Sequence, residues 1–325
     1  MREGFALWAN PSSPHAEGRK ARSLLEEARG RIKALLSWEG ELVFTSGASE
    51  GIAIALGQAK LPPAACSAVE HDAVLRQAGA AERWPVARET GLVEPPGALP
   101  AGLVAIQHAN SETGVIQPLD AIAAGLRAAG GVLLADCAQS AGKIALPDAD
   151  MIVLSAHKFG GPIGVGALLV REFGLLRPGG GQERGYRGGT ENLPGVLGMA
   201  AALEAGAGWM AQAARLRALL EAGVKEAGGE VVAEAAPRIA TIGAYRMPGM
   251  SSAAQLIRLD AAGFAVSAGS ACSSGSLRPS HVLEAMGHLH PGEVIRVSIG
   301  RETGEDDIRR FLAAWRAAAG TAKAA

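Results

Sequence analysis

Short apolar runs alternate with segments of helical periodicity along the first two thirds of the chain. Runs at 41–45, 66–69, 103–107, 131–135 and 151–155 are typical of buried strands, whereas 14–36 has the apolar spacing of an amphipathic helix. A further run at 164–170 predicts the returning partner of a hairpin. Strands that alternate with helices in this way predict an α/β domain with a mostly parallel sheet.

The last third of the chain has a different pattern. Residues 193–227 are rich in Ala and Leu and predict one long helix that bridges to a second domain. Beyond it, strands expected at 238–244 and 294–299 mix with helices expected at 253–260 and 306–318, which predicts a smaller α+β domain. We therefore expect a large α/β domain at 8–205 and a small domain at 206–325.

Composition narrows the class of protein. The 325 residues carry a net charge of −1 without a long basic run, which argues against nucleic acid or an anionic membrane as the main partner. No apolar run approaches the roughly 20 residues of a membrane span. Three cysteines are too few for a disulfide framework and suit a reducing cytoplasm.

Polar residues with chemical potential stand where the predicted strands end. Lys158 follows the 151–155 run, beside the hydroxyl of Ser155 and the imidazole of His157, a setting that suits a Schiff-base lysine. Asp136 ends the preceding run, and Gln139 lies one turn further on. An acid that can protonate a pyridine nitrogen, near a lysine that can bind an aldehyde, is what pyridoxal phosphate requires of a protein.

Other strand ends offer weaker signals, each with an ordinary alternative. Ala48 and Ser49 lie between a strand and a helix start, where amides and the helix dipole bind phosphate, or where a helix is simply capped. His71 could lie flat on an aromatic ring, or be a plain loop residue. Asn110 and Gln139 could bond a phenolic oxygen, or cap their own loops. Taken together, five strand ends with suitable groups favour a cofactor site beyond the carboxyl edge of the sheet.

Cys272 lies in a Ser/Gly-rich segment, 267–276, that predicts a mobile exposed loop in which a thiol can be nucleophilic. Cys66 and Cys137 adjoin apolar strands and are expected to be structural. Arg296, inside a strand pattern, either faces solvent or clamps a carboxylate. The motif 288–290, His-Leu-His, lacks further ligands at usual spacings, so we expect a surface turn and no metal site.

These residues together resemble the cysteine desulfurases, class V aminotransferase-like, fold-type I pyridoxal-phosphate enzymes. The likeness runs in collinear order over nearly the whole chain. It rests on the stretches Asn10–Ser13, Phe44–Glu50, Glu70–His71, Asn110–Gly114, Asp136–Gln139, Ser155–Lys158, Gly179–Asn192 and Ser267–Ser274.

The resemblance implies a fold-type I architecture, with a seven-stranded, mostly parallel sheet in the large domain, and a homodimer. It also implies conversion of L-cysteine to alanine, with the sulfur passed to an iron–sulfur scaffold or another acceptor protein. Cys272 would carry that sulfur as a persulfide, through which it could transiently ligate an iron–sulfur cluster. The resemblance gives Lys158, His71 and Cys272 as catalytic, and Asn10 and Arg296 as substrate-binding. The cofactor contacts would be Ala48, Ser49, His71, Asn110, Asp136, Gln139, Ser155, His157, Lys158 and, from a second subunit, Thr190.

The sequence departs from the family pattern in two places. The family's amino-terminal segment before Asn10 is missing, which leads us to expect that Met1 is an internal methionine of a longer chain. Gly51 stands where an asparagine is common, which removes a polar contact but no catalytic group. Two alternatives stay open: a selenocysteine lyase or other β-lyase on the same fold, and a non-catalytic assembly scaffold.

Overall fold

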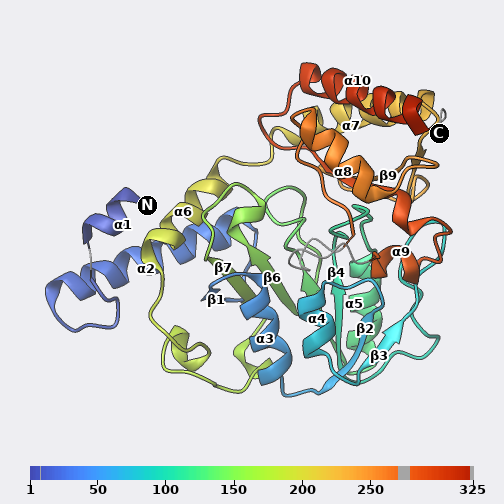
Figure 1. Ribbon diagram of the computed structural model, residues 1–325. Coiled ribbons are helices and arrows are strands. Elements are labelled where there is room, and N and C mark those ends of the chain that lie inside the picture. The colour runs from blue at the N-terminus through green and yellow to red at the C-terminus, as the bar shows by residue number, and fades with distance from the viewer. Residues whose placement is uncertain (8, 270–278, 323–325) are drawn as a thin grey trace. The chain divides into compact units, whose positions relative to one another are not determined.

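The computed structural model describes residues 1–7, 9–269 and 279–322, which divide into two compact units (Figure 1). The first unit comprises residues 1–84, 95–108 and 118–207, and the second comprises residues 85–94, 109–117 and 208–325. Two short segments of the first half of the chain thus group with the carboxyl-terminal part, which a reading of contiguous domains from the sequence does not reveal.

The first unit is built on a seven-stranded sheet with the order β1-β7-β6-β5-β4-β2-β3. Neighbouring strands pair in parallel from β6 through β3, whereas β7 runs antiparallel to both β1 and β6. This confirms the predicted mostly parallel sheet and the hairpin return. The strands are β1 (Glu41–Thr45), β2 (Pro63–Ser67), β3 (Glu82–Trp84), β4 (Leu103–Gln107), β5 (Val132–Asp136), β6 (Met151–Ser155) and β7 (Gly166–Val170).

Helices cover both faces of this sheet. Because crossovers between parallel strands are right-handed, the connection from β1 to β2 and the oppositely directed one from β4 to β5 place their helices on opposite faces. Figure 1 agrees, with α3 in front of the sheet and α5 behind it. The helices are α1 (Arg2–Leu7), α2 (Ala16–Leu35), α3 (Ala48–Gln58), α4 (Asp72–Gln77), α5 (Leu119–Ala128) and α6 (Leu193–Glu204).

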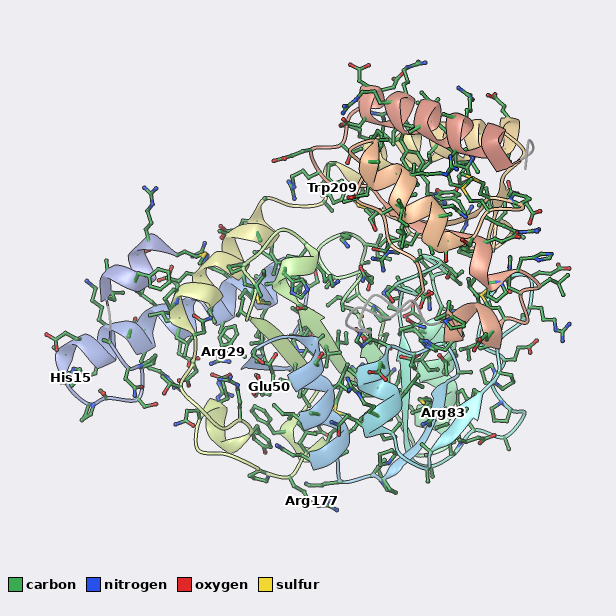
Figure 2. The ribbon with its side chains drawn as sticks, viewed as in Figure 1. His15, Arg29, Glu50, Arg83, Arg177 and Trp209 are labelled. Atoms are coloured by element: carbon green, nitrogen blue, oxygen red, sulfur yellow. The ribbon has the colours of Figure 1, made fainter. Side chains whose placement is uncertain are left out.

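A buried ion pair ties α2 to the sheet. The guanidinium of Arg29, labelled in Figure 2, binds both carboxylate oxygens of Glu183 at 2.7 and 2.9 Å and also donates to the carbonyl of Leu42 on β1. Glu183 in turn accepts the backbone N–H of Phe44 at 2.8 Å. Since each charged group has several partners, this pair fixes the start of β1 without leaving a buried charge unsatisfied.

The second unit packs helices against a three-stranded antiparallel sheet with the order β10-β9-β8. Its core contains Leu220, Tyr245, Ile295, Phe311 and Trp315, all fully or almost fully buried. The elements are α7 (Met210–Glu226), β8 (Glu230–Val231), β9 (Ile242–Arg246), α8 (Ser252–Ala261), α9 (His281–Ala285), β10 (Val294–Ser298) and α10 (Glu305–Ala322).

The prediction of one long helix over 193–227 is wrong, because the chain forms α6 and α7 with a break between them. Gly206 adopts φ 69°, a left-handed conformation that ends a helix, and Gly208 follows it. Alanine and leucine periodicity alone masked this stop signal. Of the helices in the described ranges, none combines the length and the apolarity that a bilayer crossing needs.

Two glycines, Gly47 before α3 and Gly166 at the start of β7, pack backbone against backbone and hold α3 close to the sheet. A Cβ added at Gly166 would lie 2.7 Å from the Cα of Gly47. The Gly166→Ala variant should therefore lose about 2 kcal/mol or more of unfolding free energy, from overpacking, in urea denaturation. The matched control is Gly57→Ala in α3, where nothing lies within 4 Å of an added Cβ. This control should be neutral or slightly stabilising. Equal effects of both substitutions would contradict the close packing of Gly166 against Gly47.

Candidate active site at the carboxyl edge of the sheet

The strand register brings the ends of β4, β5, β6 and β1 to one edge of the first unit. Gln107 of β4 pairs with Asp136 of β5, and Asp136 pairs with Val153 of β6. Ser155 and Thr45 both pair with Gly166 of the intervening β7. The loops that carry most of the predicted site residues therefore leave the sheet side by side, as expected for the ligand edge of a parallel α/β sheet.

Lys158 ends a single 3₁₀ turn, Ala156–Lys158, which follows β6 directly. The turn is held by the backbone N–H groups of Phe159 and Gly161, which both donate to the carbonyl of Ala156. At its start, the hydroxyl of the buried residue Ser155 lies 2.9 Å from Nδ1 of His157. Partial burial and the nearby charge of Lys158 lower the pKa of His157, so the imidazole is neutral at physiological pH and can share a hydrogen bond with Ser155. The Lys158 side chain is exposed and thus accessible to a ligand at this edge.

The amino terminus of α3 faces the same edge. Gly47 caps it with φ 155°, and a Cβ there would lie 3.4 Å from the Oγ of Ser155. No side chain in the described residues caps the helix, so the amides of its first turn, at Ala48 and Ser49, remain available as donors. Amides and a helix dipole beside a serine hydroxyl form a cradle for an anion such as phosphate.

A salt bridge links this helix terminus to the loop of Thr190. Glu50 in the first turn of α3 accepts the guanidinium of Arg187 at 2.9 Å, and Arg187 also donates to the carbonyls of Gly189 and Thr190. Thr190 itself is exposed. Its side chain is thus presented to solvent from a loop that is anchored beside the phosphate cradle.

Asp136 is a nearly buried carboxylate, 8% exposed, whose Oδ1 accepts the N–H of Ala138 at 2.9 Å. Burial raises its pKa, and the Ala138 hydrogen bond and the electrostatic influence of the nearby His71 and Lys158 side chains offset this only in part. A cationic N–H donor beside the carboxylate, as a protonated pyridine provides, would supply the compensation that burial demands. The donor set of this edge therefore fits pyridoxal phosphate at both its ring nitrogen and its phosphate.

His71 is the N-cap residue of α4. Its Nδ1 accepts the N–H of Ala73 at 3.1 Å, so the proton of the neutral ring is assigned to Nε2. This bond holds the imidazole at the end of the loop that follows β2, at the same edge as Asp136. Its place is consistent with the predicted ring contact.

The loop after β5 carries Gln139 and closes on itself. The amine of Lys143, which is 91% buried, donates to the carbonyl of Gln139 at 2.9 Å. Burial and the charge of Lys158 lower the pKa of Lys143 to about 8. Nothing in the sequence pattern pointed to Lys143, because a lone lysine in a loop has no distinguishing spacing.

Asn110 and Arg296 belong to the second unit. Asn110 is buried, and its Oδ1 accepts the N–H groups of Glu112 and Thr113 at 2.8 Å, so its Nδ2 group is the part of the amide that could donate to a ring oxygen. Arg296 is half-buried, and it donates to the carbonyl of Ser111 and to the hydroxyl of Ser267. Arg296 is therefore not the solvent-facing charge of the first alternative: it braces two loops, and its contact with a substrate carboxylate stays a prediction.

Two further predicted residues complete the account. Asn10, in the first unit, is exposed, and its Oδ1 accepts the N–H of Ser12 at 2.8 Å in a local turn. Its contact with the substrate stays a prediction. Cys272 lies outside the described residues. The other two thiols, Cys66 and Cys137, are fully buried as predicted, and burial raises the pKa of both, to about 11 for Cys66. Such thiols are poor nucleophiles near neutral pH.

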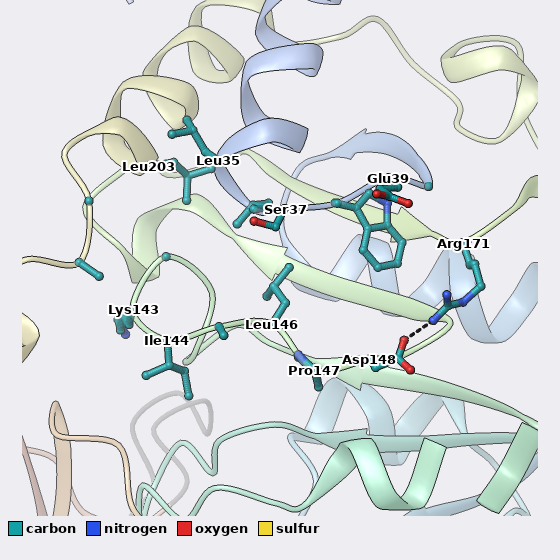
Figure 3. Close-up of a pocket in the computed structure, with 17 residues that line it drawn as sticks. Leu35, Ser37, Glu39, Lys143, Ile144, Leu146, Pro147, Asp148, Arg171 and Leu203 are labelled. Atoms are coloured by element: carbon teal, nitrogen blue, oxygen red, sulfur yellow. Dashed lines mark hydrogen bonds and ion pairs between the residues drawn. The ribbon is translucent and has the colours of Figure 1, made fainter. Parts of the chain in front are cut away.

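A cavity of about 800 Å³ opens elsewhere on the first unit, between residues 35–40 and 142–148 (Figure 3). Arg171 and Asp148 form an ion pair at one end of the cavity. Asp148 precedes β6, so this end lies near the amino end of the strand, whereas Ser155 and Lys158 lie at its carboxyl end. Of the predicted site residues in the described ranges, none lines this cavity. We therefore place the chemistry at the carboxyl edge and not in this hollow.

Comparisons with known proteins show the family and the fold of the chain. The aminotransferase class-V family matches residues 5–311. Cysteine desulfurase IscS 1 of Archaeoglobus fulgidus is 35% identical over 337 residues, covering 94% of this chain and 88% of the relative. A solved NifS-like protein has a TM-score of 0.85 at 28% identity, covering 97% of this chain and 94% of its own. SspA in complex with cysteine has a TM-score of 0.74 at 27% identity, covering 94% and 96%. The chain belongs to the class-V aminotransferase family, and the curated relatives that it matches include cysteine desulfurases.

The cost of burying Asp136 can be measured in the cofactor-free protein. Because its folded pKa exceeds the ordinary value of 3.8, the folded state binds the proton more tightly, and stability falls as pH rises through the folded pKa. Asp136→Asn keeps the acceptor for Ala138 but removes the charge. It should raise the thermal midpoint at pH 7.5 by about 2 °C or more and flatten the pH dependence above pH 4. The exposed Asp260→Asn variant is the control; a midpoint unchanged or lowered in Asp136→Asn would contradict this reading of the site.

Proposed function

We propose that this protein is a pyridoxal-phosphate-dependent cysteine desulfurase that converts L-cysteine to L-alanine and keeps the sulfur as a persulfide on Cys272. One observation carries the proposal: Asp136 and Lys158 follow adjacent parallel strands to the edge where the α3 amino terminus offers its amides. The family match and the names of the relatives support the same reaction.

Each of the predicted cofactor residues would have its own role. Lys158 would bind the aldehyde carbon, Asp136 would keep the ring nitrogen protonated, and Ser155 with the α3 amides would hold the phosphate. His71 would contact the ring face, and Asn110 and Gln139 its phenolic oxygen. Pyridoxal phosphate, when bound, supplies an electron sink for the substrate's α-carbon.

With the cofactor and substrate bound, the Lys158 amine would accept the substrate's α-proton and later return it. We expect Arg296 to receive the substrate carboxylate, since a guanidinium can bind a carboxylate in a bidentate way, and Asn10 to help in binding the substrate. The thiolate of Cys272 would then attack the substrate sulfur. The new S–S bond would form as the substrate's C–S bond breaks, and alanine would result once the β-carbon gains a proton and the α-carbon regains its own.

A persulfide must leave the enzyme for the cycle to continue. We propose that an acceptor protein, an iron–sulfur scaffold among the candidates, takes the outer sulfur of Cys272. We further propose a cytoplasmic homodimer, in which Thr190 reaches the partner's phosphate site. The solvent-facing position of Thr190, on a loop braced by Arg187, supports this arrangement.

Trapping the cofactor on its lysine tests the first half of the proposal. After borohydride reduction of the protein with pyridoxal phosphate, peptide mass spectrometry should find the phosphopyridoxyl group on Lys158. Lys158→Ala should lose the label, and the exposed Lys60→Ala control should keep it. Labelling of another lysine at the same stoichiometry in both variants would rule out the assigned role.

Removing the thiol of Cys272 tests the second half. Cys272→Ser should bind pyridoxal phosphate and cysteine, yet form no persulfide, and alanine production should fall about a hundredfold or more because the sulfur loses its acceptor nucleophile. Cys66→Ala is the control, since that thiol is buried. Sulfide release at the wild-type rate from Cys272→Ser would defeat the assignment.

A further inference from the structure

A second buried carboxyl group, that of Glu70, lies near enough to Asp136 to feel its charge, and the proposed reaction does not use it. Glu70 is fully buried (0% exposed) although it follows the turn at the end of β2, where an acid ordinarily reaches solvent. Its Oε1 accepts two hydrogen bonds, from the hydroxyl of Ser67 at 2.6 Å and from the backbone N–H of Gln107 at 2.9 Å.

These bonds connect Glu70 to both sides of the site. Gln107 pairs with Asp136 in the sheet register and donates its backbone N–H to Glu70, so it links the loop of Glu70 to the strand end that carries Asp136. The side-chain amide of Gln107 also donates to the carbonyl of Val69, which clamps the same loop a second time. His71 follows Glu70 directly and begins α4. The loop that presents His71 is thus fixed to β4 through Glu70.

We propose that Glu70 is a positioning residue of this site: a buried second carboxyl that fixes the loop of His71 and strengthens the hold of Asp136 on a protonated ring nitrogen. The part that concerns the ring nitrogen rests on the proposed function. The part that concerns the loop and its protonation does not.

The charges around Glu70 set the direction of its response to pH. Burial raises its pKa to about 8, the bonds from Ser67 and Gln107 act against this, and the charge of Asp136 adds to it. The titratable groups nearby include the thiol of Cys66 on β2 and, beside that thiol, Arg83 on β3 (Figure 2). Since the folded pKa lies above the ordinary value of 4.5, folding favours the neutral acid. Stability is therefore lost as pH rises from about 4.5 through about 8.

A cation bound at Asp136 reverses this balance. The positive charge of a protonated pyridine lowers the pKa of Glu70, so cofactor binding releases a proton from Glu70 at pH values just below 8. Affinity for the cofactor then rises with pH over that range, by at most about tenfold per pH unit, because one proton is released for each cofactor bound.

The experiment compares wild type with Glu70→Gln, which keeps the Oε1 acceptor but has no charge at any pH. In the cofactor-free protein, the thermal midpoint of wild type should fall relative to Glu70→Gln by about 3 °C or more between pH 5 and pH 9. The dissociation constant for pyridoxal phosphate, from fluorescence titration, should be similar for both at pH 6. At pH 8.5 the dissociation constant should be about fivefold larger in the variant than in wild type, which means weaker binding.

The exposed Glu82→Gln variant on β3 is the matched control and should change neither quantity. If Glu70→Gln does not fold, Ser67→Ala serves instead, because loss of its donated hydrogen bond should move the stability transition of wild type to higher pH. If the difference in thermal midpoint between wild type and Glu70→Gln does not change with pH, the proposal that Glu70 is protonated in the folded protein is overturned, whether or not cofactor binds. Normal pH-dependent stability with a constant ratio of dissociation constants overturns only its link to the ring nitrogen, and failure of wild type to bind pyridoxal phosphate instead rejects the proposed function.

Discussion

The parallel pairing of β4, β5 and β6 is the constraint on which the site depends. Gln107 and Asp136 are partners in the ladder, and Ser155 ends the next strand. The carboxyl ends of parallel strands lie at the same edge of the sheet. The three loops that begin there therefore lie side by side. A slip of one residue in this register would move Asp136 to the other face and separate it from Lys158.

Close backbone contacts extend this alignment to the helix that would bind phosphate. Gly166 lies between Ser155 and Thr45 in the ladder and approaches Gly47 where any side chain would collide. The absence of Cβ atoms lets the amino terminus of α3 sit against the end of β6. The anion cradle and the lysine turn are therefore consequences of one packing arrangement. The buried acids Asp136 and Glu70 oppose it energetically, since both fold with raised pKa values. Such a conflict between stability and local chemistry is typical of functional sites.

The sequence predicted the framework well because apolar runs and their polar ends are local signals. Five strands, β1, β4, β5, β6 and β10, match the predicted runs within one residue at each end, and the hairpin return of β7 was confirmed. The break between α6 and α7 was missed because Gly206 ends a helix through its φ angle, while the surrounding alanines continue the helical pattern. The grouping of 85–94 and 109–117 with the second unit depends on long-range contacts that no window of sequence contains.

The same limit applies to the site. Lys158 and Asp136 were recognisable because each stands at the end of an apolar run. Glu70 also follows a strand, yet its burial depends on Gln107, which lies 37 residues away in the sequence. Lys143 and the bridge from Arg187 to Glu50 had no sequence signal either, since their partners are set by the fold. Local pattern therefore finds groups that do chemistry more readily than groups that hold them in place.

A crystal structure of the protein grown with pyridoxal phosphate tests the central claim most directly. The account predicts a covalent bond from Nζ of Lys158 to the aldehyde carbon, the ring nitrogen within hydrogen-bonding distance of the Asp136 carboxylate, and the phosphate against the first turn of α3. A cofactor bound to a different lysine, or a ring nitrogen directed away from Asp136, would contradict it.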